Sequence, residues 1–91
     1  MLFVTTYKVK PYISTEETKE LMAVYAVNGD APGTKAHYIA ADGSHGVVIT
    51  ELDDATVAYK SILPYAQWIE YHTVPVVTAE DAVPHILEQI G

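Results

Sequence analysis

The sequence contains no cysteine and no arginine, and these two absences set the first limits on its chemistry. Without cysteine there is no disulfide framework, no thiolate nucleophile and no zinc–thiolate centre. Five lysines stand against 12 acidic residues, which gives a formal net charge of -7 at pH 7. Nucleic acids and anionic membranes are bound through clustered cations, so the composition argues against both. The missing arginines also argue against phosphate-bearing ligands and haem, whose acidic groups are usually met by cations.

Long hydrophobic runs are missing as well. No stretch approaches the ~20 apolar residues that cross a bilayer. Residues 1–10 lack a basic start, and their short apolar run ends in lysines, so they do not predict a signal peptide. We therefore expect a cytoplasmic protein. Hydrophobic residues make up 49% of the 91 residues and include seven tyrosines, which excludes a disordered chain and predicts a single domain over residues 1–91.

The first half of the chain predicts a strand, a helix and a hairpin. Residues 2–9 are rich in β-branched and aromatic side chains, which are typical of a strand. Ser14 and Glu17 have the spacing of a capping box, so we expect a helix over residues 15–28, ending at Asn28-Gly29. Strands are predicted at 35–41 and 44–52. Between them lies Asp42-Gly43, a pair favoured in two-residue type I′ turns.

The second half predicts a helix, a strand and a short terminal helix. Asp53-Asp54 offers an N-cap for a helix running to about residue 63, followed by an irregular turn over 65–68. A strand is expected at 69–77, where Pro75 indicates an edge strand or a bulge because proline cannot donate to a ladder. Asp81 is expected to cap the last helix, with Pro84 in its first turn. The order βαββαβ plus a helix predicts an α+β, ferredoxin-like antiparallel sheet.

The predicted sheet has more apolar surface than two helices on one face can cover. The segments 2–4, 47–49 and 74–77 are apolar at successive positions. A strand with one solvent-exposed face alternates apolar and polar residues instead. A second copy of the chain packed face to face would cover the other face. The alternative is a monomer whose terminal helix folds over it. We expect the homodimer, since a chain of 91 residues also buries a small share of its surface alone.

Three segments resemble a known superfamily. They are 40–46 (Ala-Ala-Asp-Gly-Ser-His-Gly), Asp53-Asp54 and 68–77 (Trp-Ile-Glu-Tyr-His-Thr-Val-Pro-Val-Val). With the element order, they resemble the dimeric α/β-barrel proteins, and within these a small uncharacterised bacterial branch of unknown function. The resemblance implies the fold and a homodimer that forms a dimeric α/β barrel. The superfamily includes cofactor-free monooxygenases, haem-degrading enzymes, polyketide cyclases and muconolactone isomerases, but fold-level likeness is weak support for any of these activities.

The candidate catalytic residues are His72, His37 and Tyr38. The four histidines show no local metal-binding spacing, so no metal site and no cofactor is predicted. If Ala40 faces His45 across the hairpin, alternation places Tyr38 with His45 on one face and His37 on the other. A histidine and a tyrosine in one pocket could move a proton near neutral pH, although each histidine could equally be a locally bonded strand residue. His72 has Glu70 at the same parity, which could orient it.

Two functions remain open from the sequence. The first is a non-catalytic structural or interaction module that partners with itself. The second is a cofactor-free enzyme or binding protein for a neutral, apolar small molecule, with a pocket lined by Tyr7, Trp68 and Tyr71. The module is favoured because no catalytic constellation stands out. An enclosed cavity of about 300 Å³ or more, lined by His72 or His37 together with tyrosines, would favour the pocket instead.

Overall fold

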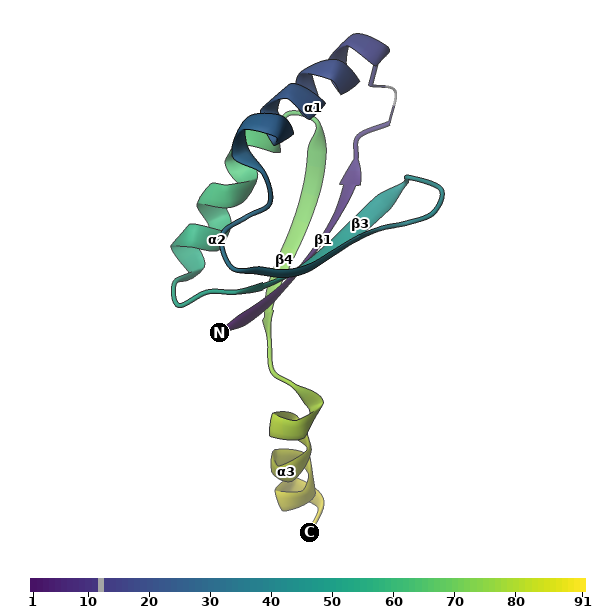
Figure 1. Ribbon diagram of the computed structural model, residues 1–91. Coiled ribbons are helices and arrows are strands. Elements are labelled where there is room, and N and C mark those ends of the chain that lie inside the picture. Colours follow the sequence, from purple (N-terminus) through teal and green to yellow (C-terminus); the bar gives the residue numbers. More distant parts are fainter. Residues whose placement is uncertain (12) are drawn as a thin grey trace.

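The computed structural model describes residues 1–11 and 13–91, which form a four-stranded antiparallel sheet with two helices on one face (Figure 1). The elements follow in the order β1 (Leu2–Val9), α1 (Thr15–Asn28), β2 (Thr34–Ile39), β3 (His45–Glu51), α2 (Ala55–Ile62), a 3-10 helix η1 (Leu63–Tyr65), β4 (Ile69–Val76) and α3 (Ala79–Ile90). The strands lie in the order β2-β3-β1-β4. The fold is therefore α+β and compatible with the predicted ferredoxin-like arrangement.

The local signals at the first two helices act as predicted. The Ser14 hydroxyl accepts from the Glu17 amide at 3.1 Å, and the Glu17 carboxylate accepts from the Ser14 amide at 3.3 Å. Asp54 accepts from the Thr56 amide at 2.8 Å and begins α2. Each of these bonds satisfies an amide that has no partner inside its helix. Strand β4 lies at the sheet edge, as Pro75 indicated.

The hairpin turn differs from the expectation by one residue. The Gly43 amide donates to the Ala40 carbonyl at 2.8 Å, so the turn is centred on Ala41-Asp42 rather than on Asp42-Gly43. Gly43 then adopts a positive φ of 74°, and the Ser44 amide donates to the Asp42 carboxylate at 3.0 Å. The aspartate side chain thus stabilises a longer loop than the two-residue turn. Strand β2 therefore ends at Ile39, and strand β3 begins at His45.

The terminal helix begins earlier than expected. The Thr78 hydroxyl accepts from the Asp81 amide at 3.1 Å, so Thr78 is the N-cap and Asp81 belongs to the first turn. The prediction that Asp81 caps the helix was therefore wrong, because a hydroxyl three residues upstream takes that role. Pro84 consequently lies inside α3, where its missing N–H leaves the Glu80 carbonyl without a helical partner.

The register assigns side chains to two faces of the sheet. Tyr38 pairs with Val47 and His37 with Val48, which confirms the predicted partners and places His37 opposite Tyr38. The face under α1 and α2 carries Phe3, Thr5, Tyr7, His37, Gly46, Thr50 and Tyr71. The other face, called the open face below, carries the apolar residues Leu2, Val4, Val47, Ile49, Val74 and Val76. The described helices leave the open face uncovered (Figure 1).

The hydrophobic core is small and sits at one end of the sheet. Leu21, Tyr65, Trp68 and Ile69 form a buried cluster where α1 meets the segment after α2. Phe3 is also buried. Among the described residues no large side chain is completely enclosed. Most of the space between α1 and the sheet is therefore not filled by packed side chains.

Candidate functional site

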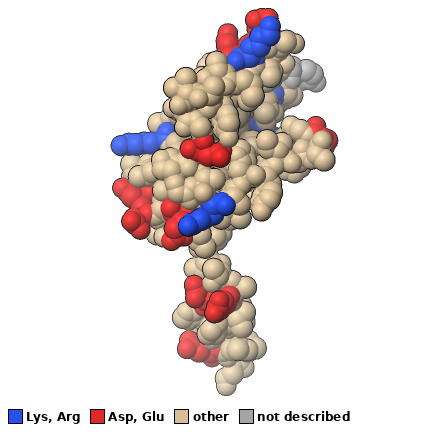
Figure 2. Space-filling view, in the orientation of Figure 1, with Lys and Arg blue, Asp and Glu red and all other residues tan. Residues whose placement is uncertain are grey.

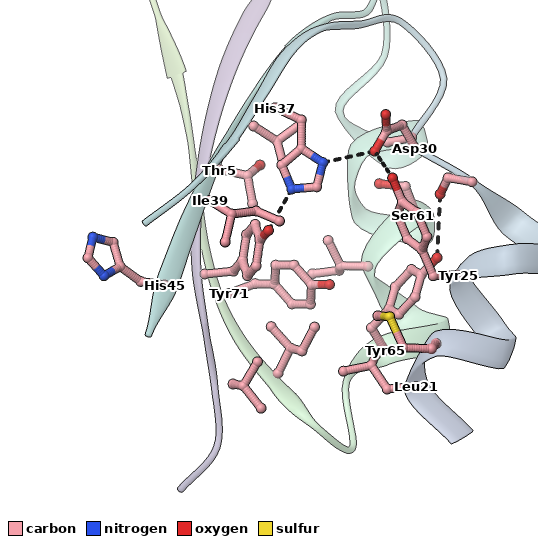
Figure 3. Close-up of a pocket in the computed structure, with 18 of the residues that line it drawn as sticks. Thr5, Leu21, Tyr25, Asp30, His37, Ile39, His45, Ser61, Tyr65 and Tyr71 are labelled. Carbon is pink, nitrogen blue, oxygen red and sulfur yellow. Dashed lines mark hydrogen bonds and ion pairs between the residues drawn. The ribbon is translucent and has the colours of Figure 1, made fainter. Parts of the chain in front are cut away.

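A pocket of about 750 Å³ lies between the sheet and its helices (Figure 3). Tyr7 and Tyr71 form its floor on the sheet, and Leu21 and Tyr25 approach it from α1. The floor is low because Thr5 and Thr50 are small and lie on the covered face. The volume falls in the range of ligand pockets, roughly 300–1,000 Å³. The pocket is open to solvent on one side, where Met22 of α1 is 54% exposed.

The polar end of the pocket is a chain of hydrogen bonds centred on His37. Its Nδ1 lies 2.9 Å from Asp30 Oδ1, and its Nε2 lies 2.5 Å from the Tyr7 hydroxyl. The same Asp30 oxygen accepts from the Tyr25 hydroxyl at 2.7 Å. Figure 3 shows His37 reaching from the sheet toward Asp30, above Tyr71. The loop after α1, strand β1 and strand β2 therefore meet at one imidazole.

The charge on Asp30 determines which nitrogen of His37 carries the proton. Hydrogen bonds from Tyr25 and His37 hold the pKa of the Asp30 carboxyl below its usual value, so it is ionised at neutral pH. An ionised carboxylate only accepts, so Nδ1 of His37 is the donor. In the neutral imidazole Nε2 then carries no proton and accepts a hydrogen bond, which the Tyr7 hydroxyl donates. His37 thus presents a proton acceptor on the pocket side.

Gly46 sets the position of Tyr7. The two residues are paired across β1 and β3, and the Tyr7 ring lies directly over the glycine. A Cβ on residue 46 would lie 2.4 Å from the Tyr7 Cζ and hydroxyl oxygen, closer than real contacts allow. The ring meets His37 edge-on, with centroids 5.6 Å apart. Only glycine at 46 lets Tyr7 lie flat enough to reach Nε2 of His37.

Four tyrosines around the pocket hold their protons more tightly than free tyrosine. Burial first and the Asp30 charge second raise the pKa of Tyr7 and of Tyr65, and burial raises the pKa of Tyr71 most strongly. The hydrogen bond to Asp30 is the main cause of the raised pKa of Tyr25. The folded state therefore binds these protons better than the unfolded state, whose tyrosines have a pKa of 10.0. The resulting stability is complete below pH 10 and is lost as the pH rises through the raised values.

We predict that alkaline titration resolves two groups of tyrosines. Phenolate absorbance should show a later group, formed by the tyrosines with raised pKa values, that ionises together with unfolding. Tyr71→Phe should reduce the later group and flatten the fall in the free energy of unfolding above pH 10. Tyr38→Phe, on the opposite face of the sheet from the pocket, is the matched control and should leave the later group unchanged. A single transition for all seven tyrosines would contradict this prediction.

The structure brings together half of the candidate residues from the sequence. His37, Tyr7 and Tyr71 line the pocket. His72 and Tyr38 lie on the open face, and Tyr38 is 64% exposed. Trp68 is 4% exposed in the core cluster and is not among the residues that line the pocket. His45 touches only the rim, on the far side of the strands in Figure 3.

Asp30 and Gly46 are the site residues that sequence reasoning missed. Asp30 was placed in a loop, seven residues before His37, and this spacing matches no motif because a loop and a strand separate the two. The available signal was weak: an acidic residue directly after the Asn28-Gly29 helix end. Gly46 carried the usual signal of a glycine inside a strand, which indicates close approach of another group.

Metal binding and membrane insertion have no structural support in the described chain. Across residues 1–11 and 13–91, no three His, Asp or Glu side chains are grouped so that they could hold a metal ion. Within the same residues, no helix has the length and apolar character needed to cross a membrane.

Comparison with known proteins gives a family but no activity. The profile of a domain of unknown function, DUF3303, matches residues 1–90. The chain belongs to this family. This match is consistent with the predicted resemblance to a small family of unknown function, while the bacterial branch and the dimeric α/β-barrel superfamily stay predictions.

No curated protein matches the chain. Among solved structures, the chain is similar to Rv0793 from Mycobacterium tuberculosis, with 13% identity and a TM-score of 0.43 over 86% of this chain and 96% of that one. The function must therefore be argued from the pocket itself.

Proposed function

We propose that this chain binds a small, neutral and largely apolar molecule that carries a hydroxyl group, and that His37 accepts the hydroxyl proton. The observation that carries the proposal is the Asp30–His37–Tyr7 hydrogen-bond chain at the polar end of the pocket. The pocket volume exceeds the value of about 300 Å³ set above, although that value was set for an enclosed cavity. The pocket is open rather than enclosed, which gives a ligand a route in.

The lining of the pocket supports a neutral ligand. Among its described residues there is no lysine, and Asp30 is the one carboxylate. An anionic ligand would meet no cation and would be repelled by Asp30. Tyrosine rings and aliphatic side chains cover most of the wall, which suits an apolar body with one polar end.

The chemistry open to the site is general base catalysis. A ligand hydroxyl that takes the place of the Tyr7 hydroxyl would donate to Nε2 of His37, and Asp30 would stabilise the imidazolium that forms. Tyr7, released from His37, remains close enough to donate to the oxyanion of the ligand. This step uses only residues of the chain.

We predict that 2-naphthol, a neutral aromatic molecule with one hydroxyl group, binds the full-length protein and that its affinity depends on a hydrogen bond to His37. His37→Phe keeps a planar ring but removes both nitrogens, so the affinity measured by fluorescence titration should fall about tenfold, as expected for one lost hydrogen bond. Naphthalene, which lacks the hydroxyl, should bind wild type and variant alike.

The matched control for this test is His72→Phe. It makes the same change on the open face and should leave 2-naphthol binding unchanged. If the wild type and His37→Phe bind 2-naphthol with equal affinity, the proposal is wrong. So would tighter binding of naphthalene than of 2-naphthol by the wild type.

We further infer that the chain forms a homodimer through its open face. The accessible surface is 6532 Å², whereas a compact chain of this mass exposes about 5,200 Å². The excess of about 1,300 Å² is larger than the roughly 800 Å² that each partner buries in a standard interface. Apolar side chains on three adjacent strands, Val47, Val4 and Val74, lie at the centre of this uncovered surface.

A further inference from the structure

The C-terminal arm, residues 77–91, projects from the rest of the molecule (Figure 1). Helix α3 leaves the end of β4 and points away from the sheet and from α1 and α2. The radius of gyration is 15.9 Å, whereas a compact domain of this length has about 12 Å. The longest dimension is 57 Å against 27 and 18 Å for the others. A chain that folded alone would be expected to fold this arm back.

Helix α3 has few means of holding itself together in water. It has 12 residues, and helices of this length are marginal without packing. Pro84 removes one of its internal hydrogen bonds, and its last turn carries Glu88 but no basic residue, which opposes the helix dipole. Packing against another surface would supply the missing stability. Along Ala79–Ile90, all of it described, no residue is buried.

The arm carries an apolar stripe that faces solvent. Its members are Val83, Ile86, Leu87 and Ile90, which are 46%, 56%, 57% and 76% exposed. They recur at the spacing of one helical face. The arm also starts at the open face, since Val76 is the last paired residue of β4 and the next residue, Val77, is 70% exposed. The helix that carries the stripe thus follows, after two residues, a strand whose last paired residue lies on the open face.

The arm is acidic, and all of the lysines of the chain lie outside it. The arm contains Glu80, Asp81 and Glu88 and no lysine. All five lysines lie within residues 1–60. Figure 2 shows this separation, with red side chains on the projecting helix and blue ones only on the body. The rest of the chain also carries nine acidic residues beside these lysines and is itself net negative, so contact between two copies depends on the apolar stripe and not on charge.

We propose that α3 is an exchanged arm, which packs its apolar stripe against the body of a second copy of this chain while the partner's arm does the same in return. This inference rests on the homodimer proposed above and is independent of the pocket. A two-fold axis makes the exchange reciprocal, so both arms and both open faces are covered at once. A second copy is the occupant that the fold itself supplies, because a two-fold assembly brings a second open face and a second stripe to the same contact.

The direct test is isotope-filtered NMR on a mixture of labelled and unlabelled full-length protein. Cross-peaks between molecules should join methyl groups of Ile86 and Leu87 in one copy to the body, residues 1–76, of the other. Cross-peaks from these methyls only to their own chain would overturn the proposal, because the arm would then fold back. So would cross-peaks between molecules that arise only from the open face.

Sedimentation at a series of concentrations gives a second test. The double substitution Ile86→Ser with Leu87→Ser should raise the dimer dissociation constant at least 100-fold, while His85→Ser with Gln89→Ser, polar changes on the same helix, should leave it unchanged. Circular dichroism reports whether the body stays folded. If the wild-type protein is a monomer, both this inference and the homodimer are wrong. If it is a dimer whose dissociation constant does not change in Ile86→Ser with Leu87→Ser, only the exchange of α3 is wrong.

Discussion

Gly46→Ala should abolish His37-dependent ligand binding although it adds a single methyl group. The new Cβ would lie 2.4 Å from the Tyr7 hydroxyl oxygen, so the ring has to move off the strand. That movement brings the ring into the pocket, where it takes the space of the ligand, and it also breaks the 2.5 Å bond to Nε2 of His37. The expected loss of stability is about 1–3 kcal/mol, the usual range for an overpacked site. Binding of 2-naphthol should fall at least as far as in His37→Phe.

A double-mutant cycle isolates this steric effect. Tyr7→Ala removes the ring that the new methyl group would meet. In that background Gly46→Ala should no longer destabilise the protein and should stabilise it by up to about 1 kcal/mol, because glycine weakens a strand. Chemical denaturation of the four proteins measures the change of sign. An equal cost of Gly46→Ala in both backgrounds would show that Tyr7 does not lie over the glycine.

Val47→Glu should break the homodimer. Val47 lies on the open face between Tyr38 and Thr6, and a two-fold axis would bring two such carboxylates into one apolar interface. Burying unpaired charge costs several kcal/mol, so we expect the dissociation constant to rise by about 1,000-fold or more. The chain's net charge of -7 adds to the repulsion at low salt.

The matched control is Tyr59→Glu. It places the same charge at an apolar residue of α2 that is 62% exposed and far from the open face in the fold. Light scattering should give about the wild-type mass for this variant and half of it for Val47→Glu. A dimer that survives Val47→Glu would mean that the open face is not the interface.

The order and type of the elements could be predicted because their signals are local. The capping box at Ser14, the cap at Asp54 and the turn residues near Gly43 each act over a few positions, and alternation then gives the register of the hairpin. Errors arose where two local signals competed. Thr78 and Asp81 are both good caps three residues apart, and the apolar pattern from Val83 onward does not decide between them.

The pocket could be predicted only in part because it is assembled from distant segments. Tyr7, Asp30 and His37 come from a strand, a loop and a second strand, and the hydrogen bonds that join them depend on tertiary packing. The alternation of side chains along a strand correctly placed His37 and Tyr38 on opposite faces of the sheet. It could not predict which of these faces would lie under the helices. Trp68 was expected in the pocket because it is aromatic and near Tyr71, yet the turn that carries it packs into the core cluster.

The central claim is that the hydrogen bond to Asp30 holds His37 in the tautomer that carries its proton on Nδ1, so that the unprotonated Nε2 faces the pocket. Long-range proton–nitrogen correlation NMR of the histidine rings at pH 8 tests it directly, since the spectrum identifies the nitrogen that bears hydrogen in each imidazole. The account predicts that His37 carries its proton on Nδ1 and that Asp30→Asn, which replaces the ionised acceptor, alters this pattern. A His37 protonated on Nε2, with a spectrum like that of the exposed His72 and insensitive to Asp30→Asn, would contradict it.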